Sequence, residues 1–411
     1  MQSQEYRPTD KRIKCEVLVV GAGPAGMMTG ISAARRGSNV IIIEQKDIPG
    51  KKIYATGNGR CNFSNQYYDS RVFRGEDPQF GYDAYKRFDK DALMGFMREL
   101  GVTCRDINGY IYPYNEQAKS VANALLYECK RLGVDIRCSQ KALDITQEKD
   151  NKINNDGGFL VTTDKEVYSC EKIIIAAGGK ASPTHGSDGN LNKVIRKLGH
   201  EIILQDPALV PLRFADSSLS LLAGVRCKCR TVLVIDGSET DNESGEIIFN
   251  NDNISGIPIM QMSRYAVRAL SHGSKVWLEL DLVPDMGDAD LKGFLETSVE
   301  KRSGIFEALG LVVNDKIAKY ICDRIKDTDE LIHFLKHFKV EIIGDCGFNK
   351  AQVTAGGVNV SQITKDLESK IIRRLFFAGE ILDIDGTCGG YNLQWAFTSG
   401  YLAGMAASVK Q

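Results

Sequence analysis

The chain has 411 residues and a formal net charge of −1, with acidic and basic residues interspersed along it, which argues against general affinity for nucleic acids or anionic membranes. No apolar run approaches the ~20 residues that span a bilayer, and the eleven cysteines follow no disulfide or metal-binding spacing. We therefore expect a cytoplasmic protein of two or three domains, with free thiols, no bound metal and no membrane span.

A predicted buried strand at residues 17–20 leads into a glycine-rich turn and a helix at residues 24–36. The strand leaves no room for charge, as is typical of a parallel sheet. Glycines in such a turn allow a tight bend, a close approach to a pyrophosphate and close helix–strand packing, and the helix directs its amides at the phosphate. The turn consists of Gly21, Ala22, Gly23, Pro24, Ala25 and Gly26.

An acidic residue follows the next predicted strand. Residues 40–43 are apolar and end at Glu44, where a carboxylate can accept hydrogen bonds from both hydroxyls of an adenosine ribose. We assign Gln45 and Lys52, which come soon after, to the same site. A glycine turn that only packs would not explain Glu44, so the whole unit predicts binding of an adenine dinucleotide.

A polar loop at residues 55–65 carries the second chemical motif. Its free backbone amides and the arginine and asparagines after them can fix a planar polar ring and its phosphate tail. The alternative is a solvated turn with a capping asparagine. We expect Cys61 to be packed rather than catalytic, because no histidine is near it in sequence. The candidate binding residues are Gly57, Asn58, Gly59, Arg60, Cys61 and Asn62.

The next elements continue an α/β pattern. Apolar spacing predicts helices at residues 87–101 and 118–132, a strand at 134–137 and a polar hairpin turn at 151–158. A buried strand at residues 172–177 then runs into Gly178 and Gly179 and should return beside the first strand. We expect these glycines to let the backbone approach the dinucleotide, the alternative being an ordinary strand-end turn.

The α/β pattern breaks near residue 195, which indicates an insertion. Short β-rich runs separated by turns such as 236–238 and 243–245 predict an antiparallel sheet or small barrel up to about residue 285, and residues 287–338 read as helical and amphipathic. The expected domains are a dinucleotide-binding domain at 1–194 and 346–411, a barrel-like domain at 195–286 and 336–345, and a helical subdomain at 287–335.

The end of the chain carries the third motif. A strand at about residues 374–378 ends at Gly379, and the carboxylate of Glu380 after it can bind the hydroxyls of a polyol chain. A helix then begins at Tyr391, and its positive N-terminal end suits a reduced isoalloxazine ring. An ADP cradle, a polyol acceptor and a helix end for a ring are the parts of an FAD site. The candidate residues here are Gly379, Glu380, Asp385, Gly390, Tyr391 and Asn392.

These motifs, at residues 19–26, 56–65 and 378–394, resemble those of the HI0933-like flavoproteins, also called the BaiN or YhiN family. The resemblance covers nearly the whole chain. It implies an α/β fold with a discontinuous Rossmann-type FAD-binding domain, an inserted β-barrel-like domain, a small helical domain and tightly bound FAD. One family branch is associated with the reduction of ring double bonds in bile-acid intermediates. Ile257 and Cys388 depart from the expected pattern, and we interpret the cysteine as filling space near the flavin.

The sequence contains one dinucleotide fingerprint, so a nicotinamide would have to dock transiently rather than in a Rossmann domain of its own. We expect an FAD-dependent reductase that passes hydride from NAD(P)H through flavin N5 to a small, apolar, unsaturated or carbonyl-conjugated substrate, with no nucleic-acid partner. The alternatives are a flavin-dependent RNA-modifying enzyme and a flavin-carrying redox sensor without turnover. The proton donor and the oligomeric state stay open.

Overall fold

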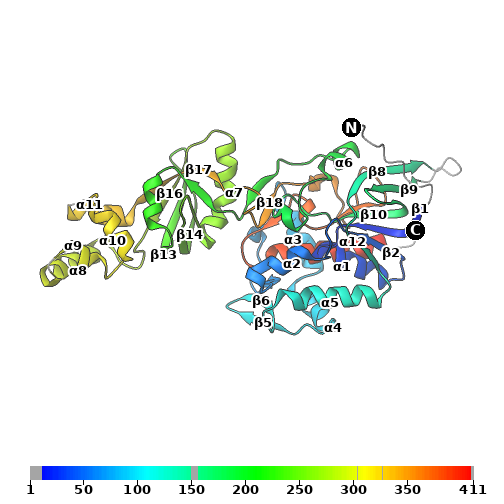
Figure 1. Cartoon of the computed structure of the whole chain (residues 1–411), viewed down its shortest axis with the longest axis horizontal. Helices are drawn as coiled ribbons and strands as arrows, with labels where there is room; N and C mark the ends of the chain where they lie inside the picture. Colours follow the sequence, from blue (N-terminus) through cyan, green and yellow to red (C-terminus); the bar gives the residue numbers. More distant parts are fainter. Residues whose placement is uncertain (1–11, 150–155, 303, 326, 409–411) are drawn as a thin grey trace, which may run out of the picture. The chain divides into compact units, whose positions relative to one another are not determined.

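The computed structural model describes residues 12–149, 156–302, 304–325 and 327–408, and the predicted hairpin turn at 151–158 lies mostly outside them. The chain forms two compact units, Met1–Gln205 with Val353–Gln411, and Asp206–Gln352 (Figure 1). The finer division into three domains stays a prediction. None of the helices in the described ranges combines the length and apolar character that a bilayer crossing requires.

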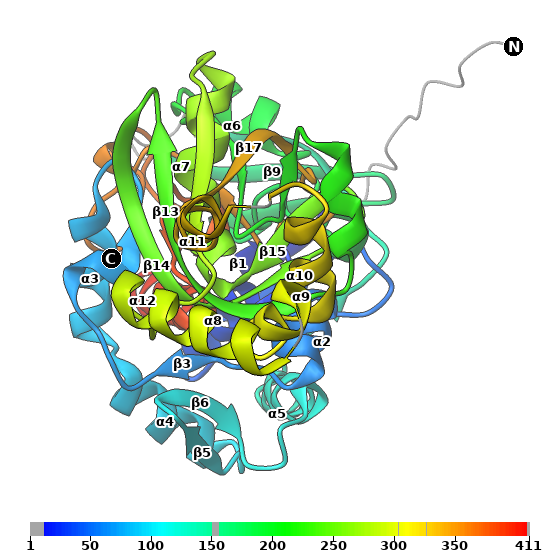
Figure 2. The same ribbon diagram turned by 90° about the vertical axis from the view of Figure 1, so that its left-hand side faces the viewer.

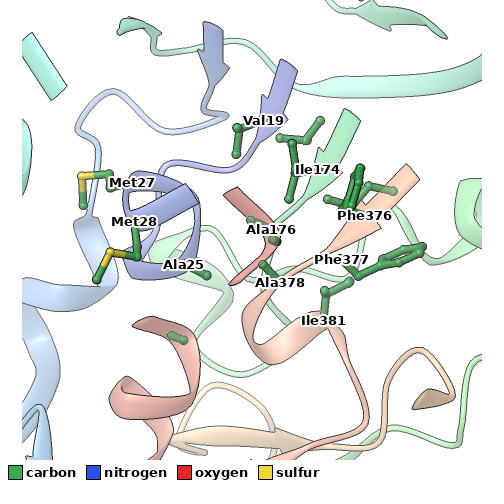
Figure 3. Packing of buried hydrophobic residues seen from close by; sticks show 14 of the residues in the cluster. Val19, Ala25, Met27, Met28, Ile174, Ala176, Phe376, Phe377, Ala378 and Ile381 are labelled. Carbon is green, nitrogen blue, oxygen red and sulfur yellow. The ribbon is translucent and has the colours of Figure 1, made fainter. Parts of the chain in front are cut away.

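The first unit is built on a seven-stranded sheet in the order β7-β2-β1-β10-β9-β8, with β19 also paired to β10. Strand β10 runs parallel to β1 with Val20 opposite Ile175, which confirms the predicted return beside the first strand. Figure 3 shows Val19, Ile174 and Phe376 on the neighbouring central strands. The strands are β1 (Arg12–Val20), β2 (Val40–Ile43), β7 (Asp135–Arg137), β8 (Ala142–Lys149), β9 (Asp156–Thr163), β10 (Val167–Ile175) and β19 (Leu375–Phe377).

Two helices lie against each other beside this sheet, α1 (Pro24–Ala34) and α12 (Tyr391–Ala407). Their backbones approach closely because α12 carries glycine at the contact: a Cβ on Gly400 would lie 2.4 Å from the carbonyl oxygen of Ala25. The hydroxyl of Thr29 donates to the carbonyl oxygen of Gly400 at 3.1 Å. Helices from opposite ends of the sequence therefore pack closely against each other.

The remaining elements of this unit include several that the sequence did not predict. The expected helix at 87–101 begins only at Lys90, because Asp89 caps it by accepting hydrogen bonds from the amides of Asp91 and Ala92. These elements are α2 (Lys51–Ala55), α3 (Pro78–Arg87), α4 (Lys90–Glu99), α5 (Ala118–Arg131), α6 (Asn192–Lys197), β3 (Ser64–Asn65), β4 (Phe73–Arg74), β5 (Cys104–Ile107), β6 (Tyr110–Pro113), β18 (Val353–Ala355) and β20 (Asp385–Gly386), with 3-10 helices at Thr56–Gly59, Ser70–Val72, Pro183–His185, Val360–Gln362 and Gly379–Ile381.

A buried carboxylate ties α1 to α5. Glu128 accepts hydrogen bonds from Arg131 at 2.7 Å and from Arg35 at 2.8 Å, and its side chain is only 8% exposed. These hydrogen bonds from Arg131, together with those from Arg35, lower the pKa of Glu128 to about 2. Arg35 also pairs with Glu99 at 2.9 Å, but that carboxylate is 64% exposed.

We expect Glu128→Gln to lower the stability of this unit at pH 7 by about 1.5–3 kcal/mol, because the buried charged hydrogen bonds are lost. Glu99→Gln removes an exposed partner of the same arginine and should cost at most about 1 kcal/mol. Because the pKa of Glu128 is lower in the folded than in the unfolded state, its contribution to stability is fully present above pH 4.5 and is lost as the pH falls towards 2. Thermal unfolding at pH 7 and pH 3 measures both effects, and an equal loss in the two variants would contradict this account.

The second unit contains a closed barrel in the order β12-β15-β14-β13-β16-β17, in which β13, β14, β15 and β17 are labelled in Figure 2. The turn at Asp236 and Gly237 joins β13 to β14 as expected. The turn predicted at residues 243–245 is wrong, because these residues lie inside β14, where Gly245 pairs with Cys229 of β13. The strands are β11 (Asp206–Ala208), β12 (Leu212–Phe214), β13 (Arg226–Ile235), β14 (Ser238–Phe249), β15 (Asn253–Gly256), β16 (Val276–Asp281) and β17 (Phe338–Asp345).

The long helix α7 (Ile257–Ser271) was not predicted within this β-rich segment. Its signal was present, since Pro258 stands in the first turn after a glycine and the buried positions Ile259, Met262 and Ala266 follow a helical period. The predicted helical stretch at 287–338 consists of α8 (Asp288–Arg302), α9 (Ile305–Leu309), α10 (Asp315–Cys322) and α11 (Thr328–Lys336), and a further 3-10 helix spans Ser217–Leu222.

Candidate functional site

The glycine turn between β1 and α1 uses its three glycines differently. A Cβ on Gly21 would lie 2.5 Å from the carbonyl oxygen of Ala176, and one on Gly26 would lie 1.8 Å from that of Gly21, so both positions are closed by backbone. A Cβ on Gly23 would have nothing within 4 Å. Gly23 is thus the place where a ligand can approach this backbone, beside the N-terminus of α1, which no side chain caps.

Glu44 lies directly after β2 and is turned towards this glycine turn. Its Oε2 accepts a hydrogen bond from the amide of Ala22 at 2.8 Å, and its Oε1 accepts one from the amide of Lys46 at 2.8 Å. Burial raises the pKa of Glu44, although these amides oppose the effect. Each carboxylate oxygen keeps a further acceptor site, so the group can still receive a hydroxyl. The neighbouring Gln45 donates instead to the carbonyl oxygen of Gly186 at 2.5 Å.

The polar loop of the second motif is held in left-handed backbone conformations. Gly57 and Asn58 have φ angles of 55° and 54°, and Cys61 has a φ of 59°. Burial raises the pKa of the Cys61 thiol to about 12, so it is a protonated, packed group. Arg60 is directed away from the loop: it pairs with Glu116 and lies over the ring of Tyr112.

A charged network connects α2 with the segment after β19. Nζ of Lys52 lies 2.7 Å from Oε2 of Glu380, whose Oε1 accepts a hydrogen bond from the amide of Thr354 at 2.8 Å. The hydroxyl of Thr354 in turn accepts from the amides of Lys180 and Ala181 at 2.7 and 2.9 Å. The structure therefore brings Lys52 and Glu380 together, although 328 positions separate them in the sequence.

The paired glycines after β10 are surrounded by this network. A Cβ on Gly178 would lie 2.7 Å from the hydroxyl oxygen of Ser187, and one on Gly179 would lie 2.4 Å from that of Thr354. Contacts within the protein already require glycine at both positions. That these residues also approach a dinucleotide stays a prediction.

The residues at the start of α12 fix the loop before it. Asn392 accepts from the amide of Gly386 at 2.7 Å and donates to its carbonyl oxygen at 2.8 Å, so both sides of the amide are used. Asp385 is buried in β20 opposite Arg74 of β4. A Cβ on Gly390 would lie 2.5 Å from the carbonyl oxygen of Ser64, so the start of α12 lies against β3 at the end of the polar loop.

Two residues that the sequence did not single out hold Gly379 in place. The hydroxyl of Ser399 accepts from the amide of Gly379 at 2.8 Å, and the indole N–H of Trp395 donates to its carbonyl oxygen at 3.1 Å. Both lie on α12, and their i, i+4 spacing was the signal that they share a face of that helix. Three features of this unit fit a ligand with a pyrophosphate, a ribose and a polyol. They are the open backbone at Gly23, the carboxylate of Glu44 and the Lys52–Glu380 pair.

Known proteins with similar sequences and folds agree with this description. The chain is 34% identical to the 3-dehydro-bile acid delta(4,6)-reductase of Clostridium scindens, over 95% of this chain and 98% of that protein. It is 25% identical to the ribosomal RNA dihydrouridine synthase of Escherichia coli, over 94% and 96% of the two chains. The solved 3-ketosteroid-delta4-(5alpha)-dehydrogenase of Rhodococcus jostii has a similar fold, with a TM-score of 0.51, 13% identity and coverage of 98% and 100%.

The model of the HI0933-like protein Rossmann domain matches residues 15–406, which is nearly all of the described chain. This match and the 34% identity over nearly all of both chains confirm the resemblance, the α/β fold with a Rossmann-type FAD-binding domain and an inserted barrel, and the assignment as a flavoprotein. The chain therefore belongs to the HI0933-like family of FAD-dependent oxidoreductases.

Proposed function

We propose that this protein reduces a ring carbon–carbon double bond conjugated to a carbonyl group in a small apolar molecule, with NAD(P)H as the source of hydride. The observation that carries the proposal is the identity of 34%, over nearly all of both chains, to a reductase named for a 3-dehydro bile acid with double bonds at positions 4 and 6. In such a molecule the conjugated carbonyl makes the far carbon of the double bond an acceptor for hydride.

The residues that we assign to FAD follow from the geometry of the first unit. The backbone at Gly23 and the start of α1 would hold the pyrophosphate, and Glu44 would accept from the ribose. Lys52 and Glu380 would face the polyol, and the loop and helix start from Gly389 to Tyr391 would hold the ring. When bound, FAD supplies a site that takes up and gives away two electrons and a proton as hydride.

A purified, yellow protein tests the proposal directly. Mixed anaerobically with NADH or NADPH, it should lose its absorbance at 450 nm, and a 3-oxo-4,6-diene bile acid should then restore it with formation of the reduced product. If neither nucleotide bleaches the flavin, but the diene restores the 450 nm absorbance of chemically reduced protein, the substrate class stands and NAD(P)H is not the source of hydride. No restoration by the diene from either starting point would exclude the proposed substrate class.

A second candidate is reduction of a uridine in RNA, favoured by the relative named as a ribosomal RNA dihydrouridine synthase. The uracil ring also carries a double bond conjugated to a carbonyl, so the same chemistry would serve. Acidic side chains outnumber basic ones in residues 206–352, which disfavours this unit as an RNA-binding surface. Restoration of the 450 nm absorbance by protein-free ribosomal RNA, and not by the diene, would favour this candidate.

A further inference from the structure

Two tyrosine rings lie close to the backbone just before α12. A Cβ on Gly389 would lie 3.1 Å from Cε1 of Tyr110 and 3.1 Å from Cε2 of Tyr391, so both rings lie close to this glycine. The side-chain amide of Asn65 donates to the carbonyl oxygen of Gly389 at 2.9 Å and holds it there. Two phenols are thus fixed beside the segment that we assign to the flavin ring.

The proton of one of these phenols is already used. The hydroxyl of Tyr391 donates to the main-chain carbonyl oxygen of Tyr67 at 2.9 Å. A carbonyl oxygen can only accept, so this hydrogen bond fixes the direction of the proton. Tyr391 itself is almost completely buried. It is therefore a structural element of the site rather than a source of protons.

A third phenol nearby, Tyr68, stands edge-on to Tyr391 with ring centroids 5.0 Å apart, and its proton is used as well. The amide nitrogen of Gln394 donates to the carbonyl oxygen of Phe88 at 3.2 Å, which leaves its Oε1 as an acceptor. The hydroxyl of Ser64 donates to that Oε1 at 2.7 Å, so it can only accept from the hydroxyl of Tyr68, 3.3 Å away.

Tyr110 differs from both of these residues. Its hydroxyl has no hydrogen-bond partner in the described part of the chain, and its side chain is half-buried on β6. Burial raises the pKa of Tyr110, and the nearby thiol of Cys388 raises it further. The phenol is therefore protonated at neutral pH, and its proton is not committed to the protein.

We propose, on the basis of the function proposed above, that Tyr110 donates the proton that completes reduction of the substrate. The double bond takes a hydride from the reduced cofactor at one carbon and a proton from Oη of Tyr110 at the other. The π bond breaks and two C–H bonds form, and the phenolate recovers its proton from water. A protonated phenol whose proton no other group of the protein holds can act as the general acid towards the carbanion-like centre that hydride addition leaves.

The test separates the two halves of the reaction. Holoenzyme is reduced with dithionite, which needs no nucleotide, and mixed anaerobically with the 3-oxo-4,6-diene bile acid while 450 nm absorbance is followed. Tyr110→Phe should slow re-oxidation by roughly 100-fold or more, the usual contribution of a positioned acid, and should abolish the solvent deuterium isotope effect. Tyr110→His, which restores a donor, should recover part of the rate. Tyr114→Phe is the control, because Tyr114 lies beyond the end of β6 and is 60% exposed.

Two further readouts show whether the cofactor site is intact. Tyr110→Phe should keep the FAD content and melting temperature of the wild type, and its reduced form should react with oxygen at the wild-type rate. If the diene re-oxidises the reduced wild type and Tyr110→Phe at equal rates, the role of Tyr110 is overturned and the proposed function stands. Failure of the wild type to react with the diene would overturn both.

Discussion

Gly23→Ala should give a folded but colourless protein. The Cβ would meet no atom of the chain within 4 Å, and Gly23 has a φ of −73°, which any residue adopts. The added methyl group instead takes the space where we place the pyrophosphate. Loss of one or two hydrogen bonds to a charged group, at about 1.5–3 kcal/mol each, corresponds to roughly 10- to 10,000-fold weaker FAD binding. Titration of apoprotein with FAD measures this loss, and the melting temperature of the apo form should not change.

A neighbouring substitution gives the contrast that makes this result informative. In Gly26→Ala the Cβ would overlap the carbonyl oxygen of Gly21, so this variant should lose stability as well as FAD. Gly95→Ala is the matched control, because Gly95 lies inside α4 with open space around it and alanine favours a helix. Full FAD affinity in Gly23→Ala would show that the pyrophosphate does not lie against this turn.

The distinction among the glycines shows how far the sequence alone could lead. The order of strand, glycines, helix, strand and acid predicted the turn correctly, because each feature depends on residues close in sequence. The start of α12 at Tyr391 also agrees with the prediction, since Gly389 and Gly390 stop any earlier start. The sequence did not reveal that Gly23 alone is open, because that depends on what the rest of the fold places around it.

Long-range contacts account for the features that could not be predicted. Lys52 and Glu380 were both assigned to the cofactor, but their ion pair exists only because the fold brings α2 close to the segment after β19. Tyr110 was not singled out at all, since a tyrosine in a short strand carries no motif. Its place beside Gly389 results from the packing of β6 against the end of the chain, and its free proton appears only when every neighbouring hydrogen bond is followed.

We expect Glu44→Gln to bind FAD about 10- to 100-fold more weakly at pH 7. The ribose hydroxyls would donate to a charged acceptor in the wild type and to a neutral amide in the variant, a difference of about 1.5–3 kcal/mol. Equilibrium titration of apoprotein with FAD measures the change. Asp135→Asn is the control, because Asp135 lies on the adjacent strand β7 in an exposed ion pair with Arg137 and should leave FAD affinity unchanged.

The pH dependence of this variant tests the same contact independently. Burial raises the pKa of Glu44, so lowering the pH should protonate it earlier than an ordinary carboxyl, whose pKa is 4.5. Wild-type FAD affinity should then fall as the pH decreases from 7 to 5, and Glu44→Gln should lack this component. The stability of the apoprotein should change in the opposite direction and rise as the pH decreases. The raised pKa means that burial of the charged carboxylate costs stability, and protonation of Glu44 removes that cost. Parallel FAD affinities of wild type and variant across this range would show that the carboxylate does not contact the ribose.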